Sequence, residues 1–336
     1  MARALRERGW HVSGDDTDAG RVREALDRSI IDAAGLDPLA EITFVATPVL
    51  TLAAEVSRAL EATTGVVTDV GSVKAAVVGA VDDPRFVGGH PMAGSELVGL
   101  DGADAAMFEG AVWVLTPSDS TADATFSAVA SVVAEMGAEV VALRAEHHDR
   151  VVATISHVPH LTAASLMGVA SSRSEEHAAL LRLAAGGFRD MTRIASGHPA
   201  IWLDICAQNR EAILSSLDDL IVNLSSMRDI VDRGDREQLL ARLSRAREAR
   251  ANLPARVTHP EELAEVRVTI LDRPGSAAEL FTLAAELGVN IANFEVVHSA
   301  EGSRGIAVIL VDAQTAELYR GGLLARGYRP SIQRLA

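Results

Sequence analysis

The residue best suited to acid–base chemistry is His90, in the stretch Gly88-Gly89-His90-Pro91-Met92-Ala93-Gly94-Ser95-Glu96. An imidazole can be neutral or charged near pH 7, so it can serve as a general base. The glycines and the proline favour an irregular backbone at the end of a predicted strand, which would present the ring in a loop. A lone histidine is more often structural, but Ser95 and Glu96 follow closely and can complete a polar network. We therefore take His90 as the centre of a candidate small-molecule site.

A second polar segment, Thr68-Asp69-Val70-Gly71-Ser72-Val73-Lys74, also follows a predicted strand. Ligands of open α/β sheets bind at the carboxyl ends of the strands, so this segment is a candidate for contact with a ligand. The same residues are also typical of a helix start, with Ser72 as the cap and Asp69 favouring the helix dipole. The sequence leaves both interpretations open.

Histidines and acids cluster again between Glu146 and His160. Their spacing differs from H-E-x-x-H and no cysteine pair accompanies them, so we expect no metal site. Pro159 lies in a stretch of helical composition, where it removes a backbone hydrogen bond and should kink the helix. The kink would turn polar groups toward a substrate, namely Ser156, His157 and His160.

Two arginines and an aspartate stand out in the segment Gly186–Ala195, because the surrounding region is rich in alanine and leucine. An arginine offers a planar fork that binds a carboxylate in two places, so Arg189 and Arg193 are candidates for carboxylate recognition. A surface salt bridge is the alternative, above all for Arg189.

Residues 1–144 alternate between short β-type runs and alanine-rich helical stretches, which predicts a Rossmann-like, doubly wound α/β domain. The β-type runs are continuous and apolar, as in a parallel sheet that helices cover on both faces. They are Trp10–Gly14, Glu41–Ala46, Gly65–Val70, Arg85–Gly88, Ala111–Leu115 and Glu139–Leu143.

The start of this domain lacks two expected features. A dinucleotide-binding domain normally opens with a strand and a glycine-rich turn, yet no G-x-G-x-x-G precedes Trp10. We expect the first strand to be missing from the sheet and the true start to lie upstream. Asp16 follows the run Trp10–Gly14, which would be the second strand of a complete dinucleotide-binding domain. An acid at that place binds the adenosine ribose and favours NAD over NADP. A solvated turn is the alternative interpretation of Asp16.

The middle third, residues 145–252, carries no β signal and is expected to be all-helical. Apolar residues at spacings of three and four between Trp202 and Leu224 predict one face of a long helix. Long apolar faces of this kind exceed what one chain can cover, which suggests a homodimer. Residues 253–263 break the helical pattern and are expected to form a linker.

Residues 264–336 return to strand-type patterns. Val266, Val268 and Ile270 alternate as a strand, whereas Leu280 and Leu283 lie on one face of a helix. The complete order of predicted elements is βαββαβ, a ferredoxin-like unit.

The net charge, the length of the apolar runs and the cysteine count exclude several functions. The 336-residue chain has a net charge of −15 and no basic stripe, so we expect no nucleic-acid partner. No apolar run approaches the roughly 20 residues that cross a bilayer, so we expect no membrane association. The single cysteine, Cys206, allows no disulfide within the chain. We expect a cytoplasmic protein.

Taken together and in this order, these segments resemble the prephenate dehydrogenase family. The family oxidises prephenate with NAD⁺ and releases CO₂, giving 4-hydroxyphenylpyruvate in tyrosine biosynthesis, and it joins a nucleotide-binding domain to a helical dimerisation domain. The tail is similar to an ACT regulatory domain through Asp272-Arg-Pro-Gly275 and Gly288-Val-Asn-Ile291. The stretches that carry the family resemblance are Asp69-Val-Gly-Ser-Val-Lys74, Gly89-His-Pro-Met-Ala-Gly-Ser-Glu96, Ser156-His-Val-Pro-His160, Gly187-Phe-Arg-Asp-Met-Thr-Arg-Ile194 and Trp202-Leu-Asp-Ile205.

The resemblance implies a role for each matching residue. His90 would take the proton from the ring hydroxyl of the substrate, with Ser72 beside it as the second catalytic residue. The implied substrate contacts are Arg193, His160, Ser156, Ser95, Glu96 and Trp202. The implied contacts to NAD are Asp16, Thr47, Pro48, Asp69 and Ser72. An amino-acid effector, with tyrosine as the feedback inhibitor, would bind through Asp272, Gly275, Asn290 and Ile291.

Three alternatives accompany this interpretation. Arogenate, which carries an amine in place of the keto group of prephenate, is an alternative substrate. A truncated chain that only dimerises and binds an amino acid is an alternative of a different class. For the ACT-like tail, the alternative to effector binding is a purely structural role.

Overall fold

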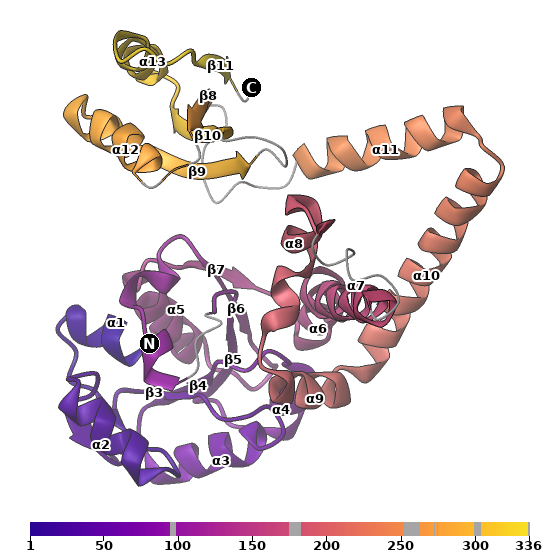
Figure 1. Ribbon diagram of the computed structural model, residues 1–336. Helices are drawn as coiled ribbons and strands as arrows, with labels where there is room; N and C mark the ends of the chain where they lie inside the picture. The colour runs from indigo at the N-terminus through magenta and orange to yellow at the C-terminus, as the bar shows by residue number, and fades with distance from the viewer. Residues whose placement is uncertain are drawn as a thin grey trace. The chain divides into compact units, whose positions relative to one another are not determined.

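The computed structural model describes residues 1–94, 99–174, 183–251, 263–271, 273, 275–298 and 304–334 (Figure 1). The chain forms two compact units. The first contains residues 1–169 and 192–235, and the second contains residues 170–191 and 236–336. The sequence predicts domain limits at residues 144, 252 and 263, where the strand-type and helix-type patterns change. These limits remain predictions.

The first unit is built on a five-stranded sheet with the order β3-β4-β5-β6-β7. Strands β3, β4 and β5 are parallel, as expected, but β6 runs antiparallel to β5. The expectation of a wholly parallel sheet is therefore wrong. The segment between β5 and β6 supplies no α-helix among its described residues, and a parallel return needs a long crossover. The strands are β3 (Ile42–Val45), β4 (Val66–Asp69), β5 (Phe86–Pro91), β6 (Val112–Thr116) and β7 (Glu139–Ala142).

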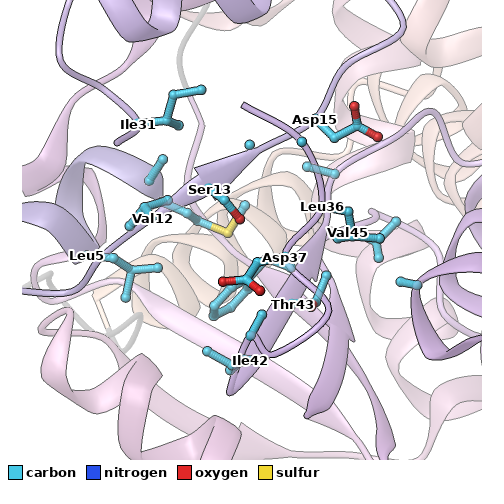
Figure 2. Close-up of a pocket in the computed structure, with 18 of the residues that line it drawn as sticks. Leu5, Val12, Ser13, Asp15, Ile31, Leu36, Asp37, Ile42, Thr43 and Val45 are labelled. Atoms are coloured by element: carbon cyan, nitrogen blue, oxygen red, sulfur yellow. The ribbon is translucent and has the colours of Figure 1, made fainter. Parts of the chain in front are cut away.

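Two short strands stand apart from this sheet. Strand β1 (Ser13–Gly14) pairs in parallel with β2 (Ala33–Ala34), and the described residues show no ladder between this pair and β3. A cavity of about 450 Å³ lies between β1 and β3 (Figure 2). Val12 lines it from the side of β1 and Ile42 from the side of β3.

Helices surround the sheet and bury two apolar clusters against it. One cluster centres on Trp113, which is fully buried between Phe44 and Phe108. The other joins Leu52 and Val56 to the strand residues Val45 and Val67. The helices are α1 (Ala2–Glu7), α2 (Ala19–Asp27), α3 (Leu52–Ala62), α4 (Ala75–Ala80) and α5 (Asp123–Glu135), with 3₁₀ turns η1 (Gly99–Gly102) and η2 (Ala105–Phe108).

An interrupted helix follows the sheet. Helix α6 (Ala145–Val152) passes into a π-helical turn, η3 (Ala153–His157), and then into α7 (Val158–Ser174). Pro159 has no backbone N–H to donate, so the regular hydrogen-bonding ladder cannot run through this region. The π turn ends two residues before Pro159, in the stretch where the sequence predicts a kink.

The long helix expected around Trp202 is two helices. Helix α9 (Pro199–Gln208) ends at Asn209, whose backbone leaves the helical region, and α10 (Arg210–Asp232) begins directly after it. The amide side chain of Asn209 faces the protein interior, where it has hydrogen-bond partners of its own. The remaining helical elements are α8 (Gly186–Thr192), η5 (Arg193–Ser196) and α11 (Arg236–Ala251). No helix in the described ranges is both long and apolar enough to span a membrane.

The second unit contains a four-stranded antiparallel sheet with the order β11-β8-β10-β9. This order and the two helices give the ferredoxin-like βαββαβ arrangement that the sequence predicts. Ala292 in β9 is exposed, because the register between β9 and β10 shifts opposite Leu310 and Val311. The elements are β8 (Leu263–Leu271), α12 (Ser276–Glu286), β9 (Ile291–His298), β10 (Arg304–Asp312), α13 (Ala316–Ala325) and β11 (Ser331–Arg334).

Candidate active site

His90 lies near the end of β5, directly after two glycines that have no room for a side chain. A Cβ on Gly89 would lie 2.6 Å from the carbonyl oxygen of Asp69 and 2.9 Å from the hydroxyl of Thr68. A Cβ on Gly88 would lie 2.4 Å from the hydroxyl of Thr116. The glycines therefore let β5 approach its neighbours closely, and this approach fixes the position of His90.

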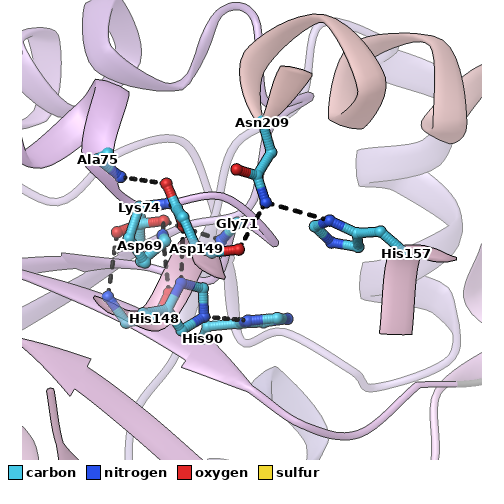
Figure 3. Close-up of polar contacts among 10 residues, drawn as sticks. Asp69, Gly71, Lys74, Ala75, His90, His148, Asp149, His157 and Asn209 are labelled. Atoms are coloured by element: carbon cyan, nitrogen blue, oxygen red, sulfur yellow. Dashed lines mark hydrogen bonds and ion pairs between the residues drawn. The ribbon is translucent and has the colours of Figure 1, made fainter. Parts of the chain in front are cut away.

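A chain of hydrogen bonds runs from His90 into the protein (Figure 3). Nδ1 of His90 lies 2.8 Å from Nε2 of His148, and Nδ1 of His148 lies 2.8 Å from Oδ1 of Asp149. His148 is fully buried and Asp149 is 4% exposed. The chain thus joins the end of β5 to helix α6 through two buried residues.

The surroundings of His90 favour its neutral form. Burial of the ring is the main cause of a pKa well below the usual 6.5, and His148, Lys74 and His157 lower it further. A neutral imidazole keeps one nitrogen lone pair, which is what a general base needs.

Lys74 and Asp69 form a fully buried ion pair beneath this chain. The ammonium of Lys74 also donates to the carbonyl of Gly89 over 2.9 Å. Asp69 accepts from the backbone N–H groups of Gly71 and Gly89. The Asp69 side chain is fully buried and both its carboxylate oxygens have partners inside the protein, so its expected contact with NAD stays a prediction. Asp69 holds the two polar loops together.

Asp149 provides the cap for helix α4. Its carboxylate accepts from the backbone N–H groups of Lys74 and Ala75, each over 2.8 Å. The alternative in which Ser72 caps a helix is therefore wrong, because the helix begins three residues later and its cap comes from α6. Ser72 lines one pocket together with His90, which agrees with its expected place beside the base.

The π turn carries Ser156 and His157 in different environments. His157 is 1% exposed, and its Nδ1 accepts from the amide of Asn209 over 3.2 Å. Burial is the main cause that lowers the pKa of His157 to about 4, against the usual 6.5. Nε2 of His157 has no partner within the described residues. Ser156 is partly buried on the same turn.

His160 and Trp202 form a second group of expected site residues. Their rings stack with centroids 3.6 Å apart and an interplanar angle of 14°. Burial lowers the pKa of His160 below its usual value. Gly197 lies beside the stack, where a Cβ would meet the His160 ring at an ordinary contact distance of 3.4 Å. Arg193, at the start of η5, is exposed.

Three of the residues expected to bind NAD follow the carboxyl ends of β1 and β3, namely Asp16, Thr47 and Pro48. Thr47 lines the cavity, and its hydroxyl is buried without a hydrogen-bond partner among the described residues. Pro48 follows it and is exposed. Asp15 lines the cavity, whereas Asp16 is held in its own turn by Arg21 and by the N–H of Asp18. An unpartnered hydroxyl and a carboxylate beside one cavity fit the ribose end of a dinucleotide.

Some expected contacts lie outside the described residues. These are Ser95, Glu96 and Asp272. Gly275, Asn290 and Ile291 lie in the second unit, where Gly275 has a positive φ of 92° directly before α12. Sequence reasoning missed the roles of His148, Lys74 and Asn209. The cluster of histidines and acids between residues 146 and 160 could have indicated His148, but we considered its histidine pair only as possible metal ligands.

A Rossmann-like sheet with polar side chains at the carboxyl ends of its strands is typical of nucleotide-binding proteins, and a histidine of strongly shifted pKa there is a candidate functional residue. Residues 1–142 match the domain model for the prephenate dehydrogenase nucleotide-binding domain, and residues 144–245 match the model for the prephenate dehydrogenase dimerization domain. The chain belongs to the prephenate dehydrogenase family.

Individual relatives agree with this assignment. A prephenate dehydrogenase of Bacillus subtilis (strain 168) is 35% identical over 246 residues, which cover 71% of this chain and 66% of that protein. The chain thus spans just under two thirds of the length of this relative. The crystal structure of prephenate dehydrogenase from A. aeolicus in complex with hydroxyphenyl propionate and NAD⁺ superimposes with a TM-score of 0.70 at 29% identity, covering 74% of this chain and 92% of that one. Synechocystis arogenate dehydrogenase gives a TM-score of 0.63 at 29% identity, covering 74% and 93%.

Proposed function

We propose that this chain is an NAD-dependent prephenate dehydrogenase of the cytoplasm that serves tyrosine biosynthesis. The observation that carries the proposal is His90, which lines a pocket with Ser72 while its Nδ1 is bonded to His148. This leaves Nε2 of His90 as the nitrogen that can face a substrate. The family membership supports the choice of substrate.

The residues of this chain would act on the substrate hydroxyl. Nε2 of His90 takes the hydroxyl proton, and the C–O bond becomes a carbonyl as the ring carbon loses hydride. NAD⁺, when bound, supplies the acceptor for that hydride. The ring carboxylate then leaves as CO₂, and its bonding electron pair completes the aromatic ring. His90 returns its proton to the oxygen. Aromatisation provides the driving force, so positioning and proton transfer are the main tasks of the protein.

The remaining expected site residues are proposed to hold the two ligands. Arg193 binds a substrate carboxylate, and the stacked pair of His160 and Trp202 forms a wall of the pocket. Ser156, Ser95 and Glu96 contribute polar contacts to the substrate. On the cofactor side, Thr47 and Pro48 contact NAD, and we place the ribose contact at Asp15 because it lines the cavity.

Arogenate is the second candidate substrate, because the Synechocystis arogenate dehydrogenase has the same fold. NADH formation should be measured with prephenate and with arogenate at matched concentrations. The proposal expects a higher kcat/KM with prephenate. A preference for arogenate would reassign the substrate, and no NADH with either would favour a chain that only dimerises and binds an amino acid.

A homodimer through the helical region is part of the proposal. Helices α9 and α10 expose large apolar side chains, which a monomer would leave in water. They include Ile201, Leu203, Leu214, Ile221, Val222 and Leu224. Light scattering during size-exclusion chromatography should give twice the mass of the 35.4 kDa chain. A single-chain mass at micromolar concentration would contradict the dimer.

We further propose that the ferredoxin-like unit is an ACT domain that binds tyrosine as a feedback effector. The proposed contact residues are Asp272 and Gly275, which precede α12 in the chain, and Asn290 and Ile291 at the start of β9. Added tyrosine should lower the rate of NADH formation, whereas phenylalanine and leucine serve as comparison ligands. Equal rates with and without tyrosine would leave the unit with a structural role.

A further inference from the structure

With both imidazole rings neutral, the hydrogen atoms along the chain from Asp149 to His90 follow from which atoms can only accept hydrogen bonds. An ionised carboxylate only accepts hydrogen bonds, and Asp149 already accepts from two backbone N–H groups. The hydrogen between Asp149 and His148 therefore belongs to Nδ1 of His148.

The same logic continues to His90. A neutral His148 with hydrogen on Nδ1 has a lone pair on Nε2, which lies 2.8 Å from Nδ1 of His90. This atom must then carry the hydrogen on His90, so the lone pair of His90 lies on Nε2. The ring planes are inclined at 75°, with centroids 5.0 Å apart.

We propose that His148 and Asp149 are positioning residues that hold His90 in the tautomer with a free Nε2. The inference rests on the proposed function, because it assigns a purpose to a buried pair that would otherwise only stabilise the fold. After His90 takes a proton, its Nδ1 still donates to His148, so the chain needs no rearrangement in either protonation state. Asp149 also caps α4, which places the loop bearing Ser72 in a fixed relation to His90.

The neighbouring histidine offers a matched control. His147 and His148 are adjacent on α6, yet His147 is exposed and His148 is fully buried. His148→Phe keeps a planar ring but removes the acceptor for His90. His148→Gln restores one acceptor oxygen. His147→Phe makes the same chemical change at a position that has no part in the chain.

The first experiment is isotope-edited NMR of the histidine ring nitrogens, with the His90 signals identified by their loss in His90→Asn. The inference expects a protonated Nδ1 and an unprotonated Nε2 in the unmodified protein and in His147→Phe, and a mixture of tautomers in His148→Phe. A proton on Nε2 of neutral His90 in the unmodified protein would overturn the inference, as would an unchanged tautomer in His148→Phe.

The second experiment measures kcat and KM for prephenate. The expected result is a fall in kcat of about 10²-fold in His148→Phe, partial recovery in His148→Gln, an unchanged KM and an unchanged kcat in His147→Phe. A kcat of His148→Phe equal to that of the unmodified protein would overturn the inference. Failure of the proposed function gives a different result: no turnover by the unmodified protein, with the His90 tautomer still as expected.

Discussion

The two halves of the proposed site are built in opposite ways. Around His90, side chains from β4, β5 and α6 and the start of α4 satisfy one another through buried hydrogen bonds (Figure 3). The cavity between β1 and β3 is bordered by two strands without a shared ladder, and the hydroxyl of Thr47 at its edge has no partner in the described part of the chain (Figure 2). The contrast teaches that side-chain hydrogen bonds position the proposed base, whereas the proposed cofactor cavity is formed by the unpaired edges of β1 and β3.

We expect the largest effect on the buried network from removing one partner of the ion pair between Lys74 and Asp69. Asp69→Asn leaves a buried ammonium without its counter-charge, so we expect the free energy of unfolding to fall by about 3–5 kcal/mol. Lys74→Met in the same chain removes that charge, and the double variant should recover part of the loss. Urea unfolding of Asp69→Asn, of Lys74→Met alone and of the double variant gives the values. A double variant less stable than the sum of both single changes would contradict a direct pairing.

Acid should weaken the network through His157. Its pKa in the folded protein is about 4 and its usual value is 6.5, so the folded state disfavours the charged ring. The resulting stability is fully present above pH 6.5 and is lost as the pH falls toward 4, by an amount on the order of 3 kcal/mol. His157→Gln should flatten this loss, and His147→Gln, an exposed neighbour on α6, should not. Equal pH dependence in all three proteins would count against the assignment.

The close approach of β5 can be tested at its glycines. Gly89→Ala places a Cβ against the backbone of Asp69, so we expect a loss of about 1–3 kcal/mol in stability together with reduced turnover. Gly79→Ala is the matched control, because a Cβ there meets nothing within 4 Å and Gly79 lies in helix α4. This change should stabilise by about 0.5–1 kcal/mol. Thermal unfolding distinguishes the two, and an undisturbed Gly89→Ala protein would refute the packing argument.

The cofactor side should respond to mutation more weakly. Asp15→Asn removes the charge from a carboxylate that lines the cavity, so KM for NAD⁺ should rise about fivefold, which corresponds to one hydrogen bond. Asp16→Asn should change KM less, because that carboxylate is bonded within its own turn. Steady-state kinetics at saturating prephenate provide the values. A larger effect at Asp16 would return the ribose contact to the residue favoured by the sequence.

The sequence was sufficient for features that depend on local pattern. The alternation of β-type runs and helices predicted the Rossmann-like domain, and the turn and strand signals after residue 264 predicted the βαββαβ order. The proline rule located the irregular helix at Pro159. The family resemblance implied that Ser72 lies beside His90, and the two residues line one pocket.

Features that depend on long-range contacts could not be predicted in this way. Asp149 caps a helix 75 positions earlier in the chain, and no local signal distinguishes this role from that of a surface acid. The helix break at Asn209 lies inside a continuous apolar pattern, so the pattern gives no sign of it. The Asn209 amide donates hydrogen bonds to the Asp149 carbonyl and to His157, which are distant in sequence. The antiparallel β6 reflects the connection before it, which composition alone does not reveal.

The central claim is that His90 is the base in the oxidation of prephenate. It is tested most directly by the rate of NADH formation from prephenate and NAD⁺, compared between the unmodified protein and His90→Asn. The account predicts that kcat falls by about 10²–10⁴ in the variant, with NAD⁺ binding and thermal stability retained. An equal kcat in both proteins would contradict it.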